Sequence, residues 1–174
     1  ERLAKTVKQQ HHDEWMNKIY EWEGEYPIHK PYDGVFTPQC IMETVNAAIG
    51  RDSIATTDVG QHQMWAAQYL MVERPRKFIT SGGLGTMGFG LGAAIGAQVA
   101  NPDYVVVNIT GDGCFHMNMQ ELATAAKYDL PVIDVIINNN VLGMVRQWQN
   151  LFYDKRFSNT TLDKKTDYEL VSKG

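Results

Sequence analysis

Residues 104–140 read YVVVNITGDGCFHMNMQELATAAKYDLPVIDVIINNN, and this stretch decides the fold. Two apolar runs, Tyr104–Thr110 and Pro131–Ile137, are typical of buried strands, and a helix is predicted between them over Asn118–Tyr128. A strand, a helix and a second strand over this length indicate a crossover between two parallel strands.

The same alternation continues on both sides of this stretch. Thr37 can cap a helix that Pro38 begins and Gly50 ends. Further strands are predicted at Ser53–Val59 and Lys77–Ser81, and further helices at His62–Leu70, Thr86–Ala100 and Gly143–Phe152. Strands that alternate with helices predict the α/β class, with a doubly wound parallel sheet and helices on both faces.

The chain is predicted to have two parts. Residues 1–36 read as a helical arm and a linker from a preceding domain, and residues 37–174 read as the α/β domain. The sequence does not begin with Met, and its last predicted helix, Asp167–Lys173, is short. We therefore expect a piece of a larger protein, truncated at the C-terminal end of the domain.

Composition excludes several classes of protein. The 174 residues are 44% hydrophobic and 21% charged with a net charge of −4, so no electrostatic argument favours binding to nucleic acid or to an anionic membrane. The longest apolar run, near Gly82–Ala100, is rich in glycine and contains Thr86 and Gln98, so it does not read as a membrane span. Cys40 and Cys114 form no CxxC or Cys/His pattern, which favours a reducing, cytoplasmic compartment.

The triplet Gly111-Asp112-Gly113 and the run Asn138–Asn140 each follow a predicted strand. The carboxyl ends of parallel strands meet at one edge of a sheet, so Asp112 and Asn139 are expected to lie close together. A carboxylate and an amide oxygen suit Mg²⁺ or Ca²⁺ rather than zinc. The alternative is a helix-capping Asp and a turn Asn, which the pairing and spacing disfavour.

Other strand ends converge on the same edge. Gly60-Gln61-His62 and Gly82–Gly85 follow the other two predicted strands, which indicates one shared ligand site. His62 is a candidate neutral hydrogen-bond donor, although a single His at a strand end is more often structural. Gly83, Gly85 and Gly88 also fit a GxGxxG dinucleotide fingerprint. The acid nearest the required distance, Asp103, follows Pro102 and precedes a strand, which disfavours a nicotinamide site.

Four segments together resemble one family. They are residues 59–65 (VGQHQMW), residues 82–90 (GGLGTMGFG), the GDG…NN pair, and residues 143–148 (GMVRQW). GDG…NN alone resembles thiamine-diphosphate enzymes in general. The full set resembles the C-terminal, diphosphate-binding domain of acetohydroxyacid synthase, the acetolactate synthase large subunit.

The resemblance implies thiamine diphosphate and Mg²⁺ as cofactors, with FAD in the full-length enzyme. It implies Asp112, Asn139 and the backbone carbonyl of Val141 as metal ligands, and Met144, Arg146 and Trp148 as the substrate pocket. It also implies that Met87 holds the two cofactor rings in a V shape, where the alternative is core filling. The cofactor-binding residues it implies are Gly60, Gln61, His62, Gly85, Met87, Gly111, Asp112, Gly113, Cys114, Asn139, Val141, Leu142, Gly143 and Met144.

The implied activity is condensation of pyruvate with pyruvate or 2-ketobutyrate, with loss of CO₂, in the biosynthesis of valine, leucine and isoleucine. Implied partners are 2-ketoacids, identical subunits in a homodimer or homotetramer, and a regulatory small subunit. In this family the catalytic glutamate lies in an N-terminal domain that this sequence lacks, so the fragment is expected to be inactive. The alternatives are another thiamine-diphosphate-dependent decarboxylase, oxidase or carboligase, and a non-catalytic cofactor-binding module.

Overall fold

The computed structural model describes residues 3–8, 10–31, 33–162 and 166–174. The chain divides into two compact units, Glu1–Val35 and Phe36–Gly174. The first unit contains a 3₁₀ turn, η1 (Leu3–Lys5), and the helix α1 (Asp13–Glu25). No residue of α1 is buried. Trp15 and Trp22 meet edge to face on it, with ring centroids 5.7 Å apart.

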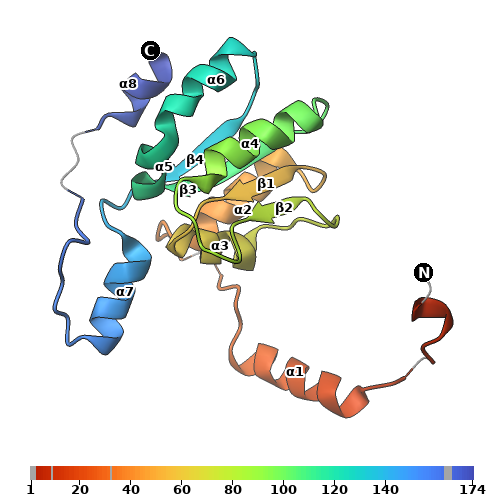
Figure 1. Ribbon diagram of the computed structural model, residues 1–174. Coiled ribbons are helices and arrows are strands. Elements are labelled where there is room, and N and C mark those ends of the chain that lie inside the picture. Colours follow the sequence, from red (N-terminus) through yellow and green to blue (C-terminus); the bar gives the residue numbers. More distant parts are fainter. Residues whose placement is uncertain (1–2, 9, 32, 163–165) are drawn as a thin grey trace. The chain divides into compact units, whose positions relative to one another are not determined.

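The second unit is built on one parallel sheet, as the sequence predicts (Figure 1). Its strands lie in the order β2-β1-β3-β4, and every neighbouring pair is parallel. The order reverses at β1, because β2 lies on one side of it and β3 on the other. The strands are β1 (Ile54–Thr57), β2 (Phe78–Thr80), β3 (Val106–Gly111) and β4 (Ile133–Ile137).

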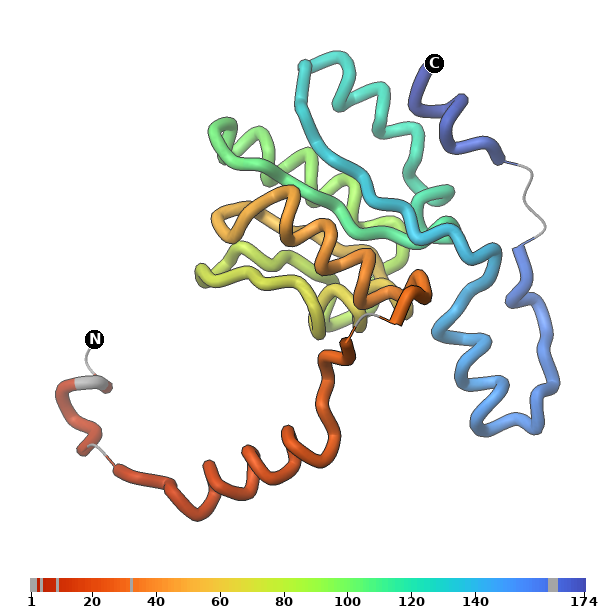
Figure 2. The backbone as a smooth tube through the Cα atoms, turned by 180° about the vertical axis from the view of Figure 1, so that it is seen from behind, coloured from red at the N-terminus to blue at the C-terminus, as the bar shows by residue number. Residues whose placement is uncertain are grey.

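Helices cover both faces of the sheet. Figure 1 shows α4 in front of the strands, and Figure 2, turned by 180°, shows α2 in front of them. The helix α2 begins as predicted, with Pro38 in its first turn and the Thr37 hydroxyl accepting a hydrogen bond from the Cys40 amide at 3.2 Å. The helices of this unit are α2 (Pro38–Ile49), α3 (Gln61–Tyr69), α4 (Phe89–Ala100), α5 (Asp112–Asn118), α6 (Leu122–Lys127), α7 (Gly143–Phe152) and α8 (Tyr168–Lys173).

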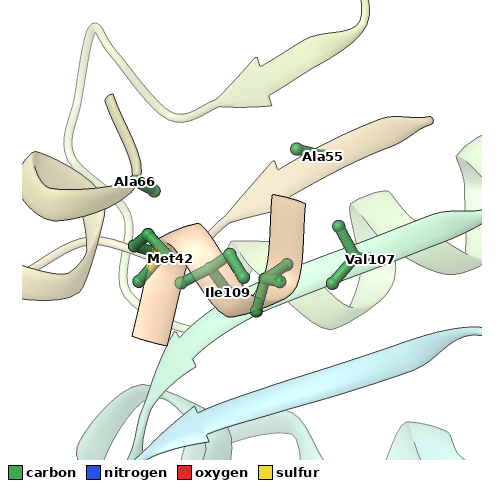
Figure 3. Packing of buried hydrophobic residues seen from close by; sticks show 6 residues of the cluster. Met42, Ala55, Ala66, Val107 and Ile109 are labelled. Carbon is green, nitrogen blue, oxygen red and sulfur yellow. The ribbon is translucent and has the colours of Figure 1, made fainter. Parts of the chain in front are cut away.

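Alternate strand residues build two hydrophobic clusters, one on each face. On one face, Ala55, Val107 and Ile109 pack against side chains of α2 and α3, including Met42 and Ala66 (Figure 3). On the other face, Ile54 and Val106 pack against Ala94 and Ala97 of α4. Strands buried on both faces are the expected form of a parallel sheet between helices.

Two predicted helices differ from the structure by more than one residue. The helix predicted at Asn118–Tyr128 is interrupted, because α5 begins already at Asp112 and the 3₁₀ turn η2 (Met119–Glu121) separates it from α6. The helix predicted from Thr86 begins only at Phe89. Gly85 and Gly88 before it have φ of +63° and +84°, a left-handed conformation that an α-helix does not contain.

No helix within the described ranges is long and apolar enough to cross a membrane.

Candidate cofactor and metal site

The site lies where the sheet reverses its strand order, between the carboxyl ends of β1 and β3. Asp58, Val59 and Gly60 follow β1, and Asp112 follows Gly111, the last residue of β3. Ligands of doubly wound sheets bind in the crevice outside the strand ends at such a point. The topology therefore selects this crevice before any side chain is considered.

The His62 imidazole fills the space between the two strand ends. It is only 6% exposed. A Cβ added to Gly60 would lie 2.8 Å from its Cε1 atom, and a Cβ added to Gly111 would lie 2.8 Å from its Nδ1 atom. Any side chain at either position would displace the ring, so both glycines make room for His62.

Burial lowers the pKa of His62 from 6.5 to about 4, although the nearby charges of Asp58 and Asp112 favour its protonated form. The ring is therefore neutral at physiological pH. Its Nε2 atom is buried and has no hydrogen-bond partner among the described residues. His62 also lines the cavity. A buried ring nitrogen without a partner at such a place is a candidate to contact a ligand from outside the chain.

Asp112 links the end of β3 to the turn after β4. One carboxylate oxygen, Oδ1, accepts a hydrogen bond from the Gly113 amide, and the other, Oδ2, accepts one from the Asn140 amide, both at 2.9 Å. Asn139 Oδ1 accepts from the Val141 amide at 3.1 Å. The residues of the GDG and NN motifs are thus neighbours in space.

The donor set fits Mg²⁺ held partly by a diphosphate. No group of three or more His, Cys, Asp or Glu side chains that could hold a metal occurs in the part of the chain that the structure describes. The predicted set instead contains one carboxylate, one amide oxygen and one backbone carbonyl. Mg²⁺ is commonly bound through one or two carboxylates together with substrate phosphates, rather than by an all-protein cage.

The predicted cofactor residues surround one cavity of about 50 Å³. All of them except Gly85 line it. Pockets that enclose a drug-sized ligand measure roughly 300 Å³ or more, so the cavity can receive only part of such a ligand. Four further residues that were not predicted to bind the cofactor also line the cavity: Val59, Trp65, Ile137 and Val145.

The segment at residues 160–162 pairs with the turn after β4 at residues 140–142. The Leu142 amide donates to the Thr160 carbonyl, and the Leu162 amide donates to the Asn140 carbonyl, both at 2.8 Å. Val141 and Thr161 form an antiparallel bridge. Thr160 is buried, and its hydroxyl donates to Gln149 Oε1 at 3.0 Å. No periodic pattern in this polar stretch could have revealed the pairing.

The predicted substrate residues are only partly brought together. Met144 and Trp148 line a groove of about 800 Å³ along α7, together with Val145, Gln149, Tyr153 and Arg156. Arg146 is absent from that lining, and its guanidinium lies 4.0 Å from the centroid of the Phe157 ring. Trp148 is 56% exposed in this chain.

Cys114 is an inert thiol in this structure. Its side chain is buried, and Sγ donates to the Val59 carbonyl at 3.1 Å. Burial raises its pKa to about 11.

Asp58 is the residue of this region that sequence analysis missed. Its buried carboxylate accepts from the Gly88 amide at 2.7 Å and from the Thr110 hydroxyl at 2.8 Å. The prediction placed Asp58 inside the strand Ser53–Val59, and an acid within a predicted strand was the available signal. Asp103, the acid nearest a dinucleotide-fingerprint position, is exposed and precedes β3.

Residues 58–174 match the family model described as "Thiamine pyrophosphate enzyme, C-terminal TPP binding domain". The chain belongs to this family. The match begins at Asp58 and contains the crevice, the turn after β4 and the segment at residues 160–162. The fold class and the expected thiamine diphosphate cofactor therefore agree with the family assignment.

Curated relatives confirm the narrower resemblance. The chain is 54% identical over 145 residues to the acetolactate synthase large subunit of Parasynechococcus marenigrum, covering 83% of this chain and 23% of that protein. It is 49% identical over 151 residues to that of Cyanidium caldarium, covering 86% and 26%. It is 47% identical over 163 residues to the isozyme 2 large subunit of Escherichia coli K12, covering 94% and 29%. The chain thus spans about a quarter of the length of the curated relatives it matches.

Proposed function

We propose that this chain is the diphosphate-binding part of an acetolactate synthase, in which it holds Mg²⁺ and the diphosphate of thiamine diphosphate. One observation carries the proposal: the Asn140 amide joins the turn after β4 to the Asp112 carboxylate at the end of β3, beside the neutral His62 ring. The names of the curated relatives support the choice of enzyme.

In this proposal each residue of the crevice has a defined task. Asp112 supplies the negative charge for the metal, and Asn139 and the Val141 carbonyl supply neutral oxygens. His62 is proposed to contact a diphosphate oxygen through Nε2, the ring nitrogen that has no partner among the described residues. The Cys114 amide in the first turn of α5 is proposed to face the same ligand, whereas the Gly113 amide donates to Asp112 Oδ1.

Residues of two further elements would bind the rest of the cofactor and the substrate. Met87 lines the cavity and is proposed to lie against the cofactor rings, with the Gly85 carbonyl as an acceptor for the aminopyrimidine. Met144 and Trp148 of the α7 groove are proposed to contact the 2-ketoacid. Arg146 is proposed as a pocket residue only with a different side-chain conformation, because here it stacks on Phe157.

The proposed reaction condenses pyruvate with pyruvate or 2-ketobutyrate, with loss of CO₂, for branched-chain amino-acid biosynthesis. Bound thiamine diphosphate supplies the electron sink for decarboxylation. The residues of this chain orient the cofactor, balance its charge and exclude water. A second domain is required in this proposal, because the cavity can receive only part of the cofactor.

The complete enzyme is proposed to contain FAD, to assemble as a homodimer or homotetramer and to bind a regulatory small subunit. The names of the relatives support that subunit, since they are large subunits. A cytoplasmic location is part of the proposal, and the two free cysteines are consistent with it.

Calorimetric titration of thiamine diphosphate into the chain, with and without Mg²⁺, tests the proposal. We expect binding that requires Mg²⁺ and is abolished by Asp112→Asn, which removes the charge and keeps the shape. Asp134→Asn is the matched control, because Asp134 is a partly buried acid on β4 that does not line the cavity. Binding that survives Asp112→Asn, or that does not depend on Mg²⁺, would contradict the proposed metal site.

A further inference from the structure

The backbone N–H and C=O of Gly88 are each held by a side chain that does not line the cofactor cavity. We call these two side chains, Asp58 and Asn118, the clamp. The Gly88 amide donates to Asp58 Oδ1 at 2.7 Å, and its carbonyl accepts a hydrogen bond from the side-chain amide of Asn118. Asp58 follows β1, whereas Asn118 is the last residue of α5. Two elements that carry the cofactor site thus meet at one residue of the turn before α4.

Asp58 has little freedom to move. Its second oxygen, Oδ2, accepts from the Thr110 hydroxyl at 2.8 Å, and its side chain is buried. A Cβ added to Gly90 would lie 2.8 Å from that same oxygen, so α4 packs directly on the carboxylate. A buried acceptor fixed by one hydroxyl and by close packing holds the Gly88 amide in one place.

Gly88 itself has no alternative residue that fits. Its φ of +84° is in the left-handed region, and an added Cβ would lie 3.0 Å from the Cβ of Met117. The clamp and the glycine therefore specify the same conformation of the chain at this point.

Met87 precedes Gly88 and lines the cavity. Its Cε atom lies 3.8 Å from the position that a Cβ on Gly113 would occupy, so the side chain reaches the start of α5. By contrast, Leu84 in the same turn is 96% exposed. The end of the turn that Asp58 and Asn118 hold is therefore the end next to Met87, which lines the cavity.

We propose that Asp58 and Asn118 are positioning residues, which fix the Gly88 peptide and thereby the place of Met87 against the ring-bearing part of the cofactor. This inference rests on the proposed binding of thiamine diphosphate. The clamp is expected to act on the rings rather than on the diphosphate, because neither Asp58 nor Asn118 lines the cavity that the proposed metal ligands and His62 line.

The test compares two ligands, thiamine diphosphate and inorganic diphosphate, each titrated with Mg²⁺ into the chain. We expect Asp58→Ala to weaken thiamine diphosphate binding about tenfold or more, the usual order for a lost hydrogen bond to a charged group. Asn118→Ala loses a bond between neutral groups and should weaken it roughly threefold to tenfold. Both variants should leave diphosphate binding unchanged. Asp58→Asn keeps an oxygen for the Gly88 amide and should restore most of the affinity. Asp134→Asn is the control. It changes a carboxylate on β4 that accepts a hydrogen bond from Asn108, and it should alter the affinity for neither thiamine diphosphate nor diphosphate.

Equal weakening of both ligands, or no weakening of either, would overturn the inference. Asn118 is only partly buried, so Asn118→Ala keeps the test decisive should Asp58→Ala fail to fold. If the unsubstituted chain bound neither ligand, the proposed function would fail, and hydrogen exchange would judge the clamp separately. Faster exchange of the Gly88 amide in Asp58→Ala than in Asp134→Asn supports the clamp, and equal exchange overturns it.

Discussion

The imidazole of His62 occupies the space beside the α-carbon of Gly111, so that a Cβ at Gly111 would lie 2.8 Å from His62 Nδ1. Gly111 has a φ of −96°, which any residue can adopt. Its lack of a side chain therefore serves packing rather than backbone conformation. The first glycine of the GDG motif makes room for a ring from the neighbouring strand end.

Gly111→Ala should consequently destabilise the fold by about 1–3 kcal/mol, as expected when extra volume is forced into a packed site. It should also weaken thiamine diphosphate binding, because the displaced ring lines the cavity. Urea unfolding followed by circular dichroism measures the first effect, and calorimetry measures the second.

Gly92→Ala is the matched control for that substitution. Gly92 lies on α4, and a Cβ there would meet nothing within 4 Å. Alanine is favoured over glycine in a helix by about 1 kcal/mol or less, so this variant should be neutral or slightly stabilised. Equal unfolding free energies for the two variants would contradict the packing role of Gly111.

The fold could be predicted because its signals are local. The apolar runs on either side of Asp112 and Asn139 identified β3 and β4, and parallel topology then required the two residues to be neighbours. The hydrogen bond from Asn140 to Asp112 is the direct consequence. Strand periodicity and turn chemistry were sufficient for this part of the site.

Contacts between distant segments could not be predicted. The bond from Gly88 to Asp58 depends on how the turn before α4 folds over β1, and one sequence carries no record of that geometry. The stacking of Arg146 on Phe157 and the pairing of Thr160 with Leu142 are likewise set by the path of the chain after α7. The sequence predicted the helix or strand to which each of these residues belongs. Tertiary packing determined which groups its side chain contacts.

His62 should make stability depend on pH on the acidic side. Its pKa is about 4 in the folded chain against 6.5 in an exposed histidine, so between these values the unfolded state binds more protons. The contribution of His62 to the free energy of unfolding is therefore constant above about pH 6.5 and is lost as the pH falls toward 4. The expected loss between about pH 7.5 and about pH 5 is about 2 kcal/mol.

Urea unfolding of the chain and of His62→Gln at the two pH values measures this contribution. Glutamine does not titrate, so the variant should lose less stability on acidification, and the difference between the two slopes belongs to His62. Identical pH dependence in the two proteins would contradict a buried neutral imidazole at this position.

Cys114 should resist alkylation in the folded chain. A thiol with a pKa of about 11 is ionised in only about one molecule in a thousand at about pH 8, and only the thiolate reacts. Its side chain is also buried, whereas Cys40 is partly exposed. Iodoacetamide treatment followed by peptide mass spectrometry should show modification of Cys40 without Cys114, and modification of both in urea. Early labelling of Cys114 in the native chain would contradict its assigned environment.

Trp148 and Trp65 should respond differently to truncation. Trp148 is 56% exposed and contacts Phe152 edge to face, with ring centroids 5.4 Å apart, so Trp148→Ala should change the unfolding free energy by less than about 1 kcal/mol. Trp65 packs against the cluster around Met42 and Ala66, so Trp65→Ala should cost about 3 kcal/mol. Urea unfolding of both variants separates a surface role from a core role.

In the complete enzyme proposed above, the same Trp148→Ala substitution should reduce the preference for 2-ketobutyrate over pyruvate as second substrate. A lost apolar contact with one methylene changes selectivity by roughly tenfold, and competition between the two 2-ketoacids measures it. A large loss of stability in Trp148→Ala would show that Trp148 has a packing role and would contradict the prediction. Unchanged stability with unchanged selectivity would leave the α7 groove intact as a surface but assign substrate choice to other residues.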